Sequence, residues 1–232
     1  MMRTHYAPQA ELDRWNAYLD QTTFDPTTQG PILANLVGAD TWAELRDRED
    51  AFVAVRAMTL HTHGIPATYD LDGLRAIHRH LFQDVYEWAG ELRTVTTSKC
   101  EPFARPEEIA SIMSHVADRV EQTRQLRGIN EVAVCTELAR IHHETNLAHP
   151  FRLGNGRTQR EFVTALAGVS GHSIDWSTVT GDAEATALRR ARRGDLAPLT
   201  VLYASALGHL TPEAGPSTRY GVVPVRSAGV WR

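Results

Sequence analysis

The segment AHPFRLGNGRTQREF, residues 148–162, constrains the fold of this chain more than any other stretch. An apolar helical pattern precedes it over residues 129–147, and a second helical pattern follows it from about 156 to 169. Pro150 and the two glycines between these patterns interrupt a continuous helix. The segment therefore predicts two helices joined by a short loop, with the positive end of the second helix at that loop.

The loop carries groups that suit an anion. Gly154 and Gly156 allow positive φ angles and let a ligand come close to the backbone. Asn155 offers both a donor and an acceptor. Arg157 and Arg160 stand three positions apart, so they project to roughly one side of the helix, and guanidinium groups bind phosphate through paired hydrogen bonds. Because no Gly-Lys-Ser/Thr follows, the loop is not a P-loop.

His149 is the evident acid–base group inside this loop. Two interpretations follow from the residues alone. In one, the segment is a phosphate cradle with a titratable imidazole at its entrance. In the other, it is a Gly-rich turn between helices, in which His149 caps a carbonyl and the arginines are solvated.

The rest of the chain is also mostly helical in pattern. Further helices are predicted over residues 11–20, 41–63, 70–88, 106–126, 182–193 and 195–208. Residues 21–40, which carry many Thr, Pro and Gly, predict a connecting loop. The stretch ELRTVTTSKCEPF, residues 91–103, predicts a short β-hairpin or extended flap. We expect an N-terminal extension over 1–40, a helical domain over 41–209, and a mobile tail over 210–232.

Composition excludes some classes of protein. The chain has 232 residues and a formal net charge of −4, which argues against a general nucleic-acid binder. The basic run Arg189, Arg190, Arg192 and Arg193 predicts the solvated end of a helix. No apolar run is long enough for a membrane helix, and the first residues lack the apolar core of a signal peptide. Two cysteines give neither a metal pattern nor a disulfide framework, so a cytoplasmic protein is expected.

The spacing of residues 149–160 resembles the signature of the Fic family, His-Pro-Phe-x-(Asp/Glu)-Gly-Asn-Gly-Arg-x-x-Arg. A second block, VYEWAGELRTVTTSKCEPFARPEEI at residues 85–109, is similar to the family's Trp-Ala-Gly-Glu-x-Arg segment followed by the flap. GHSIDWSTV at 171–179 and GDLAPLTVLY at 194–203 look like the family's C-terminal helices. The resemblance covers roughly residues 15–208 and implies a mainly α Fic (Fido) helical bundle with a short β-hairpin flap.

Proteins of this family typically move the AMP part of ATP onto a hydroxyl side chain of a target protein. The resemblance implies that His149 takes the proton from the target Ser, Thr or Tyr. It implies an ATP phosphate site formed by Gly154, Asn155, Gly156, Arg157 and Arg160, with Phe151 buried beneath the loop. The flap residues that would hold the target as an added strand are Thr96, Thr97, Ser98, Lys99 and Phe103. Transfer of a phosphoryl group, with the nucleotide reversed, is a related alternative.

Leu153 departs from the family pattern, which has an acid at this position. The resemblance implies that this acid binds the Mg²⁺ bridging the phosphates, and leucine cannot coordinate a hard cation. Mg²⁺ would then have to arrive on the phosphates or be reached by Glu161. Two outcomes are open: an adenylyltransferase of reduced activity, or a Fic-like module that binds a nucleotide or a protein without transfer.

Many members of the family are silenced by a helix bearing Ser/Thr-x-x-x-Glu-Gly/Asn, whose Glu pairs with the second motif arginine. No such stretch precedes residue 85. The nearest approach, Thr180 to Glu184, ends in Ala185 and falls inside the core region, so we do not expect it to act this way. A separate small antitoxin protein is one possible regulator, and a delivered effector is an alternative to a resident cytoplasmic protein.

Several other residues are assigned structural roles. HHETN at 142–146 lacks the second histidine of a zinc motif, so His142 and His143 are expected to pack at the edge of the core. His78 and His80 flank the stripe of their helix and are expected at the surface. Glu91 and Arg93 are candidates for an ion pair that braces the flap.

Overall fold

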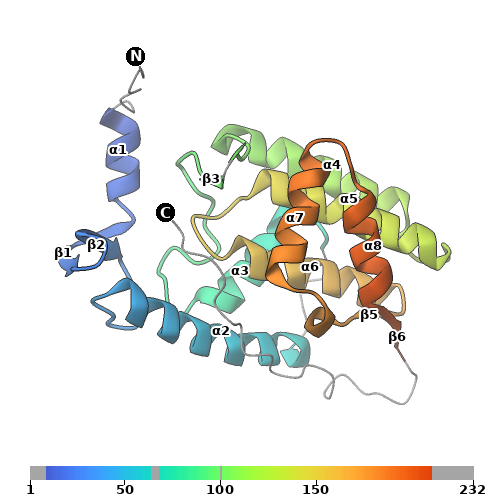
Figure 1. Ribbon diagram of the computed structural model, residues 1–232, viewed down its shortest axis with the longest axis horizontal. Coiled ribbons are helices and arrows are strands. Elements are labelled where there is room, and N and C mark those ends of the chain that lie inside the picture. The colour runs from blue at the N-terminus through green and yellow to red at the C-terminus, as the bar shows by residue number, and fades with distance from the viewer. Residues whose placement is uncertain (1–8, 64–67, 100, 211–232) are drawn as a thin grey trace.

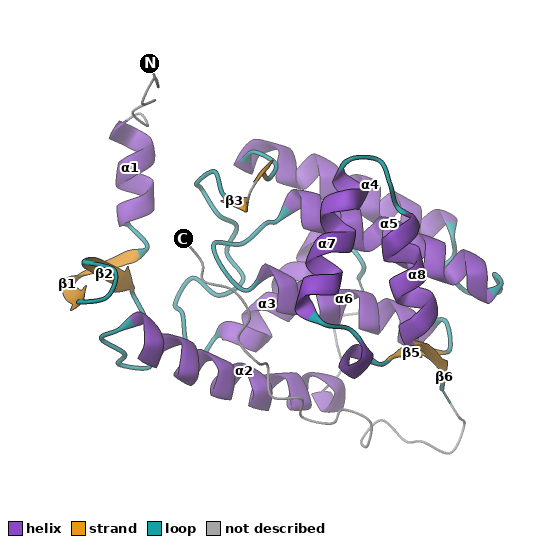
Figure 2. Ribbon diagram, in the orientation of Figure 1, coloured by secondary structure: helices purple, strands orange, loops and turns teal. Residues whose placement is uncertain are grey.

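The computed structural model describes residues 9–63, 68–99 and 101–210. It is mainly helical, with three separate two-stranded antiparallel sheets (Figure 2). This agrees with the predicted fold class of a helical bundle with a short flap. The predicted mobile tail lies almost wholly outside the described residues. Within the described ranges, no helix is long and apolar enough to cross a membrane.

The centre of the molecule is the helix pair predicted around the motif. Helix α5 spans Glu131–Ala148, and α6 spans Asn155–Val169. The Asn130 side chain accepts a hydrogen bond from the Ala133 N–H, 2.9 Å away, and so caps the start of α5. Because α5 packs against α4, α6, α7 and α8, the loop between α5 and α6 sits on a rigid support.

Two further helices build outward from α6. Helix α3 (Leu71–Phe82) packs against α6, and α2 (Trp42–His63) packs against α3 along the lower edge in Figure 1. Helix α3 is shorter than the helix predicted over residues 70–88, because it ends at Phe82. After Phe82 the chain turns, and the Val85 and Tyr86 N–H groups both bond to the Phe82 carbonyl. Leu74, Ile77 and Leu81 form the buried apolar stripe of α3, as its period predicts.

The N-terminal segment corrects the prediction of a loop over 21–40. Helix α1 (Gln9–Asn16) is followed by a hairpin of β1 (Leu19–Asp25) and β2 (Gly30–Leu33). The Pro- and Thr-rich stretch forms the turn of this hairpin, since the Asp25 carboxylate accepts the N–H groups of residues 27 and 28. The same carboxylate accepts the Trp42 N–H at 2.7 Å, which ties the hairpin to the start of α2.

The remaining elements form the flap and the outer layer. The flap hairpin pairs β3 (Ser98–Lys99) with β4 (Glu101–Pro102). A short 3₁₀ helix, η1 (Pro106–Glu108), leads into α4 (Ile109–Gln122). Beyond α6, β5 (His172–Ile174) pairs with β6 (Leu207–His209). Between these two strands, the chain forms η2 (Trp176–Thr178), α7 (Gly181–Arg192) and α8 (Ala197–Ala206). In Figure 1, α7 runs across the front of the molecule, near the motif helices.

Candidate functional site

The motif loop is held by its own side chains. Helix α5 ends at Ala148, and His149 then adopts a left-handed conformation with φ 42°. The Asn155 side chain closes the loop, because its Oδ1 accepts the Phe151 N–H at 2.9 Å and its Nδ2 donates to the Phe151 carbonyl at 2.8 Å. Phe151 is fully buried, as expected. The amide of Asn155 is therefore engaged in shaping the loop, and its backbone N–H is the group left to meet a ligand.

His78 supports the loop from α3, which corrects its predicted surface position. Its side chain is fully buried, and its ring stacks on Phe151 with the centroids 3.9 Å apart. The Gly90 N–H donates to Nδ1 at 2.8 Å, so the proton of the neutral ring lies on Nε2, which donates to the Leu153 carbonyl at 3.1 Å. Burial lowers the pKa of His78 to about 3, which keeps this tautomer neutral at physiological pH.

The two glycines of the motif differ in whether the fold requires a residue without a side chain. Gly154 has φ 79°, and a side-chain carbon there would stand 2.4 Å from the Phe82 ring. The fold itself therefore requires glycine at this position. At Gly156 an added carbon would meet nothing within 4 Å. Among the described residues, no contact requires the second glycine, and the space beside it is open to a ligand.

Free N–H groups surround this open space. The first intrahelical bond of α6 runs from the Thr158 N–H to the Gly154 carbonyl at 3.1 Å. The N–H groups of the three residues before Thr158 consequently lack intrahelical acceptors, as at every helix N-terminus. Together with the helix dipole they favour an anion at this end of α6.

Both motif arginines are already paired with carboxylates. Arg157 donates to Glu49 of α2, and its Nη1 lies 3.0 Å from an Asp50 oxygen. Arg160 directs its Nε at both oxygens of Glu184, at 3.1 and 3.2 Å. The side chains of Arg157 and Arg160 remain 34% and 28% exposed, so neither is sealed from a ligand. These acids come from helices outside the motif, and sequence reasoning assigned no role to Glu49 or Asp50.

Glu184 corrects the expectation that this stretch would not act on the second motif arginine. It lies in the first turn of α7, where Thr180 caps the helix by accepting the Ala183 N–H. The structure brings this turn against α6, so the carboxylate pairs with the second motif arginine despite the missing Gly or Asn after it. Behind it, His142 lies with Nε2 3.7 Å from Glu184, and its Nδ1 lies 2.8 Å from the Tyr203 hydroxyl.

His149 lies beneath the flap. Its ring and that of Phe103 are parallel within 7°, with centroids 3.6 Å apart. Burial lowers the pKa of His149 to about 3, and the positive charges of Arg93, Lys99 and Arg192 act in the same direction. The ring is therefore neutral at physiological pH. Its Nδ1 is buried, which leaves Nε2 as the nitrogen able to accept a proton from a substrate.

The predicted flap residues divide into two groups. Thr96, Ser98 and Lys99 are exposed, and Thr97 is partly buried. Phe103 is only 8% exposed and turns inward to cover His149. Its N–H donates to the Thr97 carbonyl at 3.0 Å, which closes the base of the flap. The three exposed residues form the outer surface of the flap, whereas Phe103 belongs to the floor beneath them.

Arg93 was missed as a site residue, because its expected ion pair with Glu91 does not form. The guanidinium is buried and donates to four backbone carbonyls instead. Two of these acceptors, Val95 and Ala104, lie on the flap, and the other two, Ala148 and His149, lie at the end of α5. Arg93 thus fastens the flap to the motif.

The residues at position 153 and around it do not fit a protein-bound Mg²⁺. Leu153 is partly buried against the apolar core, and its carbonyl accepts the His78 hydrogen bond. Among the described residues, no group of three or more His, Cys, Asp or Glu side chains could hold a metal ion. The motif loop, residues 149–156, therefore offers phosphate donors and a base but contains no carboxylate that could hold a divalent cation.

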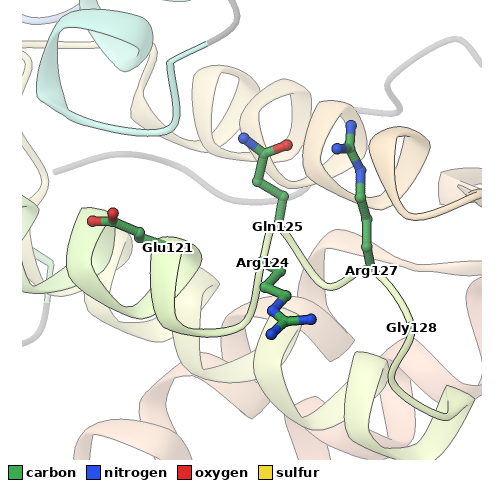
Figure 3. A pocket seen from close by; sticks show the side chains of 5 residues that line it. All are labelled: Glu121, Arg124, Gln125, Arg127 and Gly128. Atoms are coloured by element: carbon green, nitrogen blue, oxygen red, sulfur yellow. The ribbon is translucent and has the colours of Figure 1, made fainter.

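A surface hollow of about 490 Å³ lies elsewhere, where α4 ends. It is lined by Glu121, Arg124, Gln125, Arg127 and Gly128 (Figure 3). The side chains of Gln125 and Arg127 point to one side, and that of Arg124 points to the other. Since these groups do not converge and none belongs to the motif, the hollow is separate from the candidate site.

Known protein families and proteins include several that match this chain in sequence. A model of the Fic/DOC family matches residues 68–167. Protein adenylyltransferase VbhT of Bartonella schoenbuchensis is 38% identical over 156 residues, which are 67% of this chain but only 32% of that protein. The probable protein adenylyltransferase y4lH of Sinorhizobium fredii is 35% identical over 188 residues, which cover 80% of this chain and 95% of the relative.

Solved structures share the same architecture. The Bartonella tribocorum BepC protein, a translocated effector with bound AMPPNP, has a TM-score of 0.74 at 25% identity, over 84% of this chain and 98% of that chain. An N-terminal Fic domain from Bartonella quintana with bound ADP also has a TM-score of 0.74 at 25% identity, over 84% of this chain and 95% of that chain. Taken with the sequence matches, these likenesses show that the chain belongs to the Fic/DOC family and is homologous to protein adenylyltransferases.

Proposed function

We propose that this chain is a protein adenylyltransferase that moves AMP from ATP to a Ser, Thr or Tyr hydroxyl of a target protein. The observation that carries the proposal is the position of a neutral imidazole, His149, beside a helix N-terminus with open space at Gly156. Transfer needs a base, a place for phosphates and an edge on which a protein can lie. The loop, the start of α6 and the flap supply one each.

In the proposed reaction, Nε2 of His149 accepts the proton of the target hydroxyl as its oxygen bonds to the α-phosphorus. The bond between that phosphorus and the oxygen bridging to the β-phosphate breaks, and pyrophosphate leaves with the electron pair. The N–H groups at the start of α6 stabilise the anionic phosphate oxygens. A bound triphosphate also raises the pKa of His149 from its low value, which makes the imidazole a stronger base when substrate is present.

The arginines take part by exchanging partners. Arg157 and Arg160 are paired with carboxylates, so phosphate oxygens must displace or share these acids. Planar guanidinium groups can bind one anion through each edge, and their partial exposure leaves an edge accessible. In this proposal Glu184 lowers the affinity for ATP by competing for Arg160.

A target segment would lie along the flap as an added strand. The strands β3 and β4 pair over two residues each, so the outer edge of the flap has backbone groups that an extended peptide can bond. Such pairing fixes the main chain of the target whatever its side chains, and it presents one hydroxyl to His149.

A second candidate function is favoured by Leu153. Without the motif acid, the same cradle and flap would bind a nucleotide or a partner protein with no transfer. The two candidates differ in whether a covalent product forms, and the flap and cradle are common to both.

Labelled transfer separates these candidates. The protein is incubated with Mg²⁺, a host lysate and ATP labelled in either the α- or the γ-phosphate. Adenylylation places the α-label on a protein band, and His149→Ala abolishes the band because no other group replaces the base. A band with the γ-label alone would instead indicate phosphorylation, and nucleotide binding without any band would favour the binding module.

Gly156→Ala tests the phosphate cradle. The added methyl group meets no atom of the described residues within 4 Å, and alanine favours a helix by about 1 kcal/mol over glycine, so the fold should be unchanged or slightly more stable. The methyl group would fill the open space, and ATP affinity measured by calorimetry should fall at least about tenfold. Gly168→Ala is the matched control, since it lies in the same helix and also meets nothing within 4 Å. Equal ATP affinity in both variants would contradict the proposed position of the phosphates.

Glu184→Gln tests the competition for Arg160. The substitution keeps the shape of the side chain and removes its charge, so ATP affinity and transfer should rise by about tenfold, a change of about 1.4 kcal/mol. Asp182→Asn, an exposed residue in the same turn, is the control and should change neither quantity. Weaker ATP binding in Glu184→Gln would mean that Glu184 orients Arg160 for the phosphates instead of competing with them.

Leu153→Glu restores the acid of the family motif. Metal charge stabilisation is worth several kcal/mol, and about 1.4 kcal/mol is tenfold in rate, so we expect transfer to rise at least roughly a hundredfold and to depend more steeply on Mg²⁺. Because Leu153 is partly buried against the core, the variant should lose about 1 kcal/mol of unfolding free energy. Leu153→Gln controls for size without charge. If the natural chain transfers AMP rapidly and Leu153→Glu does not raise that rate, then Leu153 does not limit the reaction and the prediction is wrong.

A further inference from the structure

The end of α7 does not match the solvated basic run predicted from the sequence. Arg193 follows that prediction with a side chain 72% exposed, but the Arg192 side chain is only 12% exposed. Arg192 turns back toward the flap, where it donates to the Pro102 carbonyl and its Nε lies 3.3 Å from a Glu101 oxygen. One arginine of the run is therefore built into the flap.

Arg192 also completes a stack of three planar groups. Its guanidinium carbon lies 5.1 Å from the centre of the Phe103 ring, within the range of a cation–π contact. The Phe103 ring in turn lies parallel to His149 with centroids 3.6 Å apart. A side chain from α7 thus reaches the imidazole through a single intervening ring.

We propose that Arg192 is a positioning residue for the transfer reaction, because by clamping Pro102 and Phe103 it holds the Phe103 ring against His149 and fixes the plane in which the imidazole meets the target hydroxyl. This inference rests on the proposed function. Arg192 touches neither the substrate nor the reacting atoms in this scheme, and it acts through Phe103.

The flap needs such a clamp because its own pairing is weak. Strands of two residues each cannot order a hairpin in water without contacts from outside it. Arg93 fastens the base of the flap, whereas Arg192 fastens the strand that leads into Phe103. Without Arg192, the Phe103 ring would leave its position parallel to the His149 ring. The imidazole, no longer covered on that face, would then be free to rotate.

Arg192 should act on charge as well as on orientation. The cations around His149 are Arg93 at the flap base, Lys99 on β3 and Arg192 on α7, and each disfavours the protonated ring. The Asn146 carbonyl, from α5, favours it. Removing the charge of Arg192 therefore raises the affinity of His149 for a proton, whereas Arg192→Lys keeps the charge and removes the planar stack.

The first test needs no activity. With ¹³C-labelled histidine, the ring protons of His149 are assigned by their loss in His149→Ala and followed by NMR. Stacking on Phe103 shifts them upfield, and Arg192→Met, which keeps an apolar stem of similar reach, should remove most of that shift. Phe103→Leu should do the same, whereas Phe103→Tyr should retain it. Arg189→Met, an exposed site on the same helix, is the control, and thermal unfolding shows that each variant is folded.

The second test uses transfer rates. Arg192→Met and Arg192→Lys should both lower kcat about tenfold with the KM for ATP unchanged. The acid limb of the pH profile should move to higher pH in Arg192→Met and stay in place in Arg192→Lys. A folded Arg192→Met protein whose His149 shift and kcat equal those of Arg189→Met would overturn the proposal. If the natural chain transfers nothing, the proposed function fails, and the NMR shift still decides whether Arg192 holds the stack.

Discussion

The buried guanidinium of Arg93 joins the parts of this site that the chain supplies from separate segments. Two of its four hydrogen bonds run to carbonyls on either side of the flap hairpin, and the other two run to Ala148 at the end of α5 and to His149 directly after it. The Arg93 N–H also donates to the Pro150 carbonyl at 2.9 Å. A carbonyl oxygen compensates a buried cation less fully than a carboxylate does, so several are needed. These bonds also fix the flap relative to the motif, since moving either part alone breaks two of the four.

Helix α7 connects the opposite ends of the site. Its first turn carries Glu184, which pairs with Arg160 on α6, and its last turn carries Arg192, which donates to Pro102 on the flap. Both contacts are charged and partly shielded from water, so they are stronger than exposed surface pairs. A shift of α7 would change both contacts together. The helix is therefore a physical link between the motif helix α6 and the flap.

The sequence predicted the local parts of this structure and missed those made by tertiary contacts. The helix–loop–helix around 148–162 follows from spacing within one segment, as do the flap and the apolar stripe of α3. The β1–β2 hairpin was missed because its turn residues look like a loop until Asp25 is seen to close them. His78 was placed at the surface because its partners, Gly90 and Leu153, are distant in sequence.

The same limit applies to the acids of the site. Nothing in the pattern around Glu49 or Glu184 says that each will face a motif arginine, because that depends on how α2 and α7 pack. Replacing such a carboxylate by a phosphate exchanges one anion for another, so the net free energy gained from the arginines is a difference between two similar terms. The N–H groups at the start of α6 and the space at Gly156 are not contacted by these acids, so a phosphate gains their full interaction. The preference of this loop for a ligand with a phosphate group should therefore depend more on its backbone than on its charged side chains.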